Sequence, residues 1–148
     1  MNNYLQKYEY FIDIVLKQAI MPFARFSLFI VYFWFGALKL FNLSSANGLI
    51  DALLAKTMPF IPFDAFIIFL GFVEVMIGLL FIFPRLFKIM FGVMVVHMIT
   101  TMLPLLLLPD MTWDSFLAPS LEGQYIIKNF VLISLAGMLA LHTPVRKR

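Results

Sequence analysis

The segment AFIIFLGFVEVMIGLLFIF, Ala65–Phe83, is apolar except for one charged residue, Glu74. A helix needs about 20 such residues to cross a hydrocarbon core about 30 Å thick. Because lipid offers no hydrogen-bond partners, the backbone of a spanning segment must bond within itself, as a helix does. The segment therefore predicts a transmembrane helix that carries one ionisable side chain near its middle.

Three further segments have the same character, at about 22–41, 86–108 and 125–141. Of the 148 residues, 63% are hydrophobic and 13% are charged, and the mean hydropathy is +0.97. A soluble domain of this length cannot cover that much apolar side chain. No polar block is long enough to fold as a second domain. We expect residues 1–148 to form a single membrane domain, an all-α integral membrane bundle of four helices.

The N-terminal segment, residues 4–19, is amphipathic. Its apolar residues recur at three- and four-residue spacing, and Lys7, Asp13 and Lys17 fall between them. This pattern predicts a helix on the membrane surface that leads into the first span, with a break or bend near Pro22. The alternative is that residues 4–19 form a longer, tilted start of the first transmembrane helix.

The connections between the predicted spans differ in length. Residues 42–64 contain several Ser, Asn, Gly and Pro residues and are expected to be partly loop, with a short helix at 49–56. Residues 84–85, Pro-Arg, form a tight turn, and residues 109–124 are polar and rich in turn-forming residues.

Lysine and arginine residues predict the orientation. With a cytoplasmic N-terminus, the inner side holds Lys7, Lys17, Arg25, Arg85, Lys88, Arg146, Lys147 and Arg148, and the outer side holds Lys39, Lys56 and Lys128. Positively charged residues are enriched on the cytoplasmic side of membrane proteins. We therefore expect both termini in the cytoplasm, and in a bacterium this places the protein in the inner (cytoplasmic) membrane.

Glu74 shares one helical stripe with Gly71 and Gly78. Small residues allow helices to approach closely, so this stripe is expected to be a helix-packing face. A carboxylate inside the bundle needs a partner or a proton. It is either a proton relay or ligand-binding group, or a buried pair that holds the helices in register.

Three other ionisable residues are predicted to lie in spans. Lys39 and Lys128 are near the outer ends of the first and fourth spans, and each either snorkels to the interface or pairs with Glu74. From the helix rise, Glu74 is about 10 Å deeper than either lysine. His97 lies near the middle of the third span, where it either bonds Glu74 or is a neutral histidine with a single hydrogen bond.

Several kinds of chemistry are not indicated. The chain has no cysteine, which excludes disulfides and iron–sulfur ligation by this chain. Its two histidines, His97 and His142, differ in depth by more than about 10 Å, so haem held between them is not expected. No carboxylate–histidine cluster suggests a metal, and no covalently bound cofactor or nucleic-acid partner is expected. Catalysis by this chain alone is also not expected, because no nucleophile–base spacing is present.

Three segments carry a family resemblance: WFGALKLF at 34–41, GFVEVMIGLLFIF at 71–83 and LEGQYIIKNFVLIS at 121–134. Together they resemble the DoxX-like family of small four-helix bacterial membrane proteins. The resemblance implies a four-helix bundle and an association with respiratory or oxidative-stress chemistry; one relative is a small subunit of a thiosulfate:quinone oxidoreductase. The polar positions that match the family are Lys39, Glu74, Lys128 and Asn129, whereas His97 is outside the pattern.

These observations support three hypotheses. The first is an accessory, quinone-linked subunit of a membrane oxidoreductase or oxidative-stress system, in which Glu74 accepts or relays a proton and Lys39 or Lys128 sets its charge. The second is a transporter or permeability protein for a small solute or lipid, acting as a homo-oligomer because four short helices enclose little room. The third is a structural membrane anchor for a partner enzyme.

Overall fold

The computed structural model describes residues 2–83 and 86–142. Within these residues the chain is largely helical, and four helices are long and apolar enough to cross a membrane: Gln6–Leu40, Phe63–Ile82, Ile89–Leu107 and Leu121–His142. The all-α class is therefore confirmed, and four helices have the length and apolar composition that a membrane span requires. The tight turn predicted at 84–85 lies outside the described residues.

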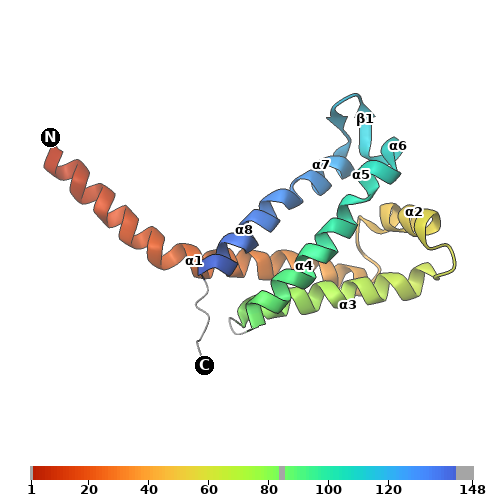
Figure 1. The fold of residues 1–148 in the computed structure, drawn as a ribbon, viewed down its shortest axis with the longest axis horizontal. Helices are drawn as coiled ribbons and strands as arrows, with labels where there is room; N and C mark the ends of the chain where they lie inside the picture. Colours follow the sequence, from red (N-terminus) through yellow and green to blue (C-terminus); the bar gives the residue numbers. More distant parts are fainter. Residues whose placement is uncertain (1, 84–85, 143–148) are drawn as a thin grey trace.

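The first helix, α1, runs without interruption over Asn2–Leu40 and contains Pro22. Proline removes one helical hydrogen bond and bends a helix without always ending it. Figure 1 shows the N-terminal part of α1 turned away from the rest of the molecule, where Tyr8, Tyr10 and Phe11 are exposed. Of the break or bend predicted near Pro22, there is no break, and Figure 1 shows the N-terminal half of the helix bent. The surface position of residues 4–19 stays a prediction.

Helices α1 and α3 (Phe63–Ile82) lie side by side and antiparallel (Figure 1). The connection between them contains α2, Asn47–Thr57, which covers the short helix predicted at 49–56. The Lys56 ammonium donates a hydrogen bond to the carbonyl of Leu107, at 2.6 Å. This bond ties α2 to the far end of the third span.

The third span consists of α4 (Phe87–Met102) and the short α5 (Pro104–Leu107). The break lies at Pro104, which has no N–H to continue the helical ladder. Figure 1 shows α4 and the last two helices, α7 (Leu121–Ile127) and α8 (Asn129–His142), crossing the α1–α3 pair at an angle.

The connection predicted as loop at 109–124 has more structure than expected. It contains α6 (Pro109–Thr112) and an antiparallel hairpin of β1 (Trp113–Ser115) and β2 (Ala118–Pro119). The final helical segment then begins at Leu121 rather than 125, because the Ser120 hydroxyl accepts a hydrogen bond from the Gly123 N–H at 3.2 Å. A serine cap of this kind satisfies an otherwise unpaired donor at a helix start.

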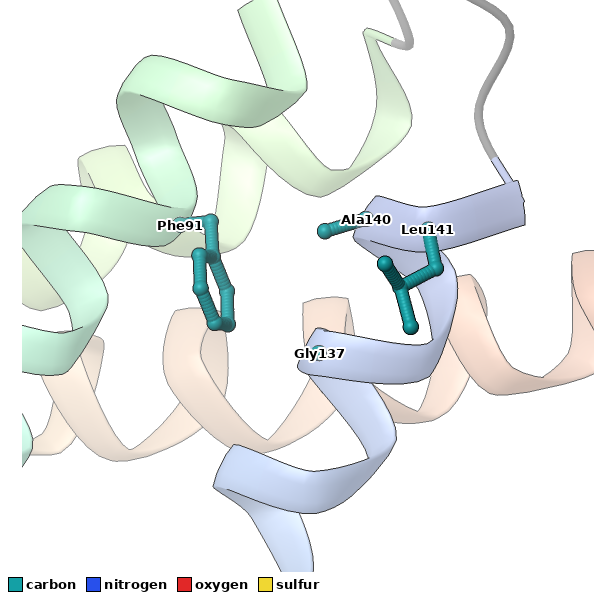
Figure 2. A pocket seen from close by; sticks show the side chains of 4 residues that line it. All are labelled: Phe91, Gly137, Ala140 and Leu141. Atoms are coloured by element: carbon teal, nitrogen blue, oxygen red, sulfur yellow. The ribbon is translucent and has the colours of Figure 1, made fainter.

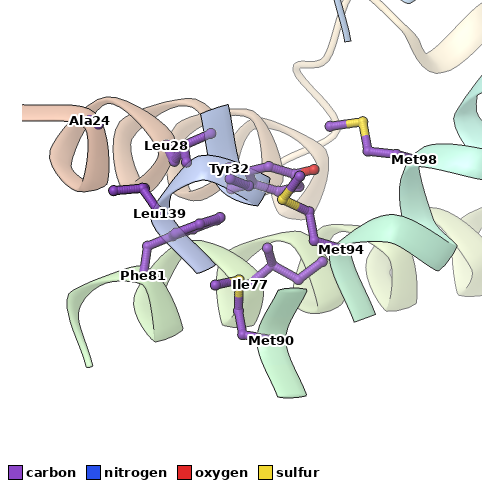
Figure 3. Close-up of a cluster of buried hydrophobic side chains, with 10 residues drawn as sticks. Ala24, Leu28, Tyr32, Ile77, Phe81, Met90, Met94, Met98 and Leu139 are labelled. Carbon is purple, nitrogen blue, oxygen red and sulfur yellow. The ribbon is translucent and has the colours of Figure 1, made fainter. Parts of the chain in front are cut away.

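Four helices contribute to the buried core (Figure 3). It is formed by Ala24, Leu28 and Tyr32 of α1, Ile77 and Phe81 of α3, Met90, Met94 and Met98 of α4, and Ala136 and Leu139 of α8. The outer faces of the same helices expose large apolar side chains, among them Phe23, Phe72 and Phe130. Such faces suit helices whose solvent is lipid.

Candidate functional site

Glycines bring the backbones of α1 and α3 into direct contact. A Cβ atom on Gly36 would lie 2.7 Å from the Val75 nitrogen, and one on Gly71 would lie 2.9 Å from the Gly36 carbonyl oxygen. A Cβ atom on Gly78 would lie 2.7 Å from the Phe33 nitrogen. Any side chain at these positions would push the helices apart. The predicted packing stripe of Gly71 and Gly78 therefore lies at the α1–α3 contact.

This contact fixes the axial register of α1 and α3, that is, which residues of the two helices lie opposite each other. The Cβ atom of Lys39 is 3.0 Å from the position of a Cβ on Gly71, one helical turn from Glu74. The Lys39 ammonium reaches Glu74 Oε2 at 2.6 Å. For Lys39, this position is closer to Glu74 than the depth difference of about 10 Å expected from the ends of the apolar segments, because hydropathy does not report how far one helix slides along another.

His97 of α4 completes the group. Its Nε2 atom lies 3.0 Å from Glu74 Oε1, so both carboxylate oxygens have a partner. Lys39, Glu74 and His97 are 6%, 6% and 8% exposed, and we call them the Lys39–Glu74–His97 cluster. Each residue comes from a different helix, so the cluster joins three of the four spans.

The cluster has a simple charge balance. An ammonium beside a carboxylate gives no net charge, which suits a group removed from water. While Glu74 is ionised it can only accept hydrogen bonds, so the Nε2 atom of His97 must carry a hydrogen. The arrangement therefore presents one fixed cation, one proton acceptor and one group that can gain or lose a proton. Among the described residues, no three His, Asp or Glu side chains gather as a set of metal ligands.

Two predicted site residues are not part of this cluster. Lys128 lies between α7 and α8, exposed, with its ammonium 3.8 Å from the Tyr125 ring centroid and 5.8 Å from that of Phe35. Asn129 starts α8 and is half-buried. Within the described part of the chain, neither side chain donates a hydrogen bond to Glu74. Of the two candidate lysine partners, Lys39 pairs with Glu74, and Lys128 instead makes cation–π contacts.

The sequence reasoning missed two residues of the site, Gly36 and Tyr32. Tyr32, Gly36 and Lys39 share one face of α1, at the spacing of a helical stripe. The Tyr32 ring lies edge-on to the ring of His97, with centroids 5.8 Å apart. A small residue and two polar residues on one stripe of a span are the signal that would have found this face.

Two hollows on the described surface lie away from the cluster. The first, of about 460 Å³, is lined by Phe91, Gly137, Ala140 and Leu141 between α4 and α8 (Figure 2). The second, of about 520 Å³, adjoins the hairpin and is lined by Pro109, Trp113, Ser115, Phe116 and Leu117. Both are mostly apolar, and no residue of the cluster lines either of them.

Comparison with models of protein families, with curated proteins and with solved structures finds no match for this chain. The resemblance to DoxX-like proteins therefore rests on the three quoted segments alone. The Lys39–Glu74–His97 cluster is the arrangement in the described residues that points most directly to a function.

Proposed function

We propose that the protein is an accessory, quinone-linked subunit of a membrane oxidoreductase, located in a bacterial inner membrane. In this proposal Glu74 takes up and passes on protons for a reaction of an isoprenoid quinone. One observation supports it most directly: within predicted spans, Glu74 bonds both a lysine and a histidine. Ionisable groups in a membrane interior are costly, and they commonly mark proton or ion pathways.

The chemistry of quinones fits such a cluster. Reduction of a quinone to a quinol takes up two electrons and two protons. We assign the electrons of this reaction to a partner subunit and the protons to the Lys39–Glu74–His97 cluster. His97 and Glu74 can exchange a proton across their 3.0 Å contact while Lys39 keeps a compensating charge beside the carboxylate. The resemblance to DoxX-like proteins supports the respiratory context.

The test uses a strain that lacks the gene, complemented with wild-type or variant protein. The measurement is the rate at which membranes of this strain reduce a short-chain quinone, once with thiosulfate and once with endogenous compounds as the electron donor. The rate in membranes that lack the protein is subtracted from each value to give the protein-dependent rate. Glu74→Gln removes the proton-accepting oxygen and keeps the shape, and we expect the protein-dependent rate to fall about 100-fold, as for loss of a general base. The matched control is Asp64→Asn, the same change at an exposed carboxylate in the first turn of α3, which should retain the rate.

Insertion is checked by the amount of each variant in the membrane fraction. An unchanged rate with Glu74→Gln at normal membrane levels would contradict the role of Glu74. A rate that does not depend on the protein at all would contradict the quinone-linked function.

A further inference from the structure

Two polar atoms beside the cluster are buried without a partner. Tyr32 Oη and His97 Nδ1 have no hydrogen bond to any described protein group, although the two residues are only 4% and 8% exposed. Their rings meet edge-on, with centroids 5.8 Å apart. Leaving one such group unpaired costs about 1–3 kcal/mol. The Tyr32 hydroxyl and His97 Nδ1 therefore need a hydrogen-bond partner that the described protein groups do not supply.

The two atoms are complementary. A tyrosine hydroxyl donates well, and the Nδ1 atom of a neutral histidine whose Nε2 carries the hydrogen can only accept. The bond from His97 to the Glu74 carboxylate selects that tautomer. A molecule that accepts from Tyr32 and donates to His97 would satisfy both atoms at once.

The surroundings limit the size of that molecule. Met94 and Met98 of α4 are 0% and 4% exposed, and Figure 3 shows the hydroxyl end of Tyr32 pointing toward them. Methionine side chains are flexible enough to shift for a small guest. An organic ring would have to displace core side chains of α1, α3 and α4. A water molecule both donates and accepts, and needs only a small space with two or more polar partners.

We propose that Tyr32 and His97 form a binding site for one internal water molecule between α1 and α4. The water extends the cluster into a continuous chain of hydrogen bonds: Tyr32, water, His97, Glu74, Lys39. A proton that arrives at the water can pass to His97 Nδ1 while the Nε2 proton moves to the Glu74 carboxylate. One proton is then transferred, and the ring is neutral again as its other tautomer. The site itself depends only on hydrogen bonding, whereas its use as a proton entrance rests on the proposed function.

Solid-state NMR of the intact protein in lipid bilayers tests the site. The chain has two histidines, so ¹⁵N-histidine labelling with His142→Gln as an assignment variant identifies the His97 signals. In the wild type, we expect magnetisation to pass from water to His97 Nδ1, and the Nδ1 shift to be that of a hydrogen-bonded acceptor. Tyr32→Phe removes one anchor of the water and keeps the ring, so the transfer should weaken several-fold. Tyr125→Phe, the same change on an exposed tyrosine of the fourth span, should leave it unchanged.

The wild-type spectrum decides the proposal even if Tyr32→Phe does not fold. The proposal would be overturned if the chemical shift of His97 Nδ1 were that of an atom without a hydrogen bond and no magnetisation passed to it from water. An organic molecule in the site would also overturn it, and would be recognised because no magnetisation would pass from water to Nδ1. A folded Tyr32→Phe variant with an unchanged signal would remove Tyr32 from the site. The experiment needs no electron donor or partner subunit. Its outcome can therefore be told apart from that of the quinone assay.

Discussion

Glu74 depends on two partners from two other helices. Lys39 holds one of its oxygens at 2.6 Å and His97 holds the other at 3.0 Å. A buried ion pair adds little net stability over an apolar pair, but removal of one partner leaves an uncompensated charge. We therefore expect replacement of one member of the pair to lower the stability of the protein more than replacement of both members.

At this scale we predict that Lys39→Met lowers the free energy of unfolding by about 3 kcal/mol. The double variant Lys39→Met with Glu74→Gln should recover part of that loss, because the isolated carboxylate is gone. The measurement is reversible unfolding in mixed micelles, analysed as a double-mutant cycle. Lys128→Met is the matched control, because that lysine is exposed and its contacts are aromatic rings. Equal effects of Lys39→Met and Lys128→Met would argue against a buried ion pair.

The elements are organised by the antiparallel contact of α1 and α3. Gly36 and Gly71 meet backbone to backbone, and Gly78 meets Phe33. In lipid there is no hydrophobic effect to draw helices together, so such close packing supplies much of their attraction. The same contact places Lys39 opposite Glu74, which links the packing of two elements to the chemistry of the site.

We therefore expect Gly36→Ala to destabilise the protein by about 2 kcal/mol, because the added methyl group meets backbone atoms that cannot move aside. It should also disturb the Lys39–Glu74 pair, so quinone reduction is expected to fall with it. Gly92→Ala is the control: a Cβ atom at Gly92 of α4 meets nothing within 4 Å. Alanine favours a helix over glycine by about 1 kcal/mol, so this change should be neutral or stabilising. If Gly36→Ala behaved like Gly92→Ala, the close helix contact would be wrong.

For the whole molecule, three of the four candidate spans lie between the N-terminal part of α1 and the β1–β2 hairpin, which predicts that these two segments lie on opposite sides of the membrane. With the N-terminal and C-terminal segments in the cytoplasm, the inner side holds eight Lys and Arg residues and the outer side three, which predicts this orientation. We therefore predict that the hairpin faces the periplasm and that its exposed tip at Phe116 and Leu117 reacts with reagents added on that side.

Cysteine labelling tests this topology without a background, because the chain has no cysteine of its own. An impermeant maleimide should modify Phe116→Cys in cells whose outer membrane is permeable but whose inner membrane is intact. It should modify Tyr8→Cys only after the inner membrane is opened. Both side chains are exposed, so access to the protein surface does not limit the reaction. The reverse pattern would invert the orientation, and labelling of both sites in intact cells would exclude an odd number of spans between them.

Hydropathy alone predicted the four candidate spans and the helical class, because the transfer of side chains into lipid is a sum over local sequence. It also singled out Glu74, Lys39 and His97 as residues that a membrane span rarely contains. Only the tertiary structure decided that Lys39 and not Lys128 pairs with Glu74, and that Tyr32 belongs beside His97. The physical reason is that partner choice depends on how far antiparallel helices slide along each other. That axial offset is set by backbone contact at Gly36 and Gly71, which no property of either segment alone reveals.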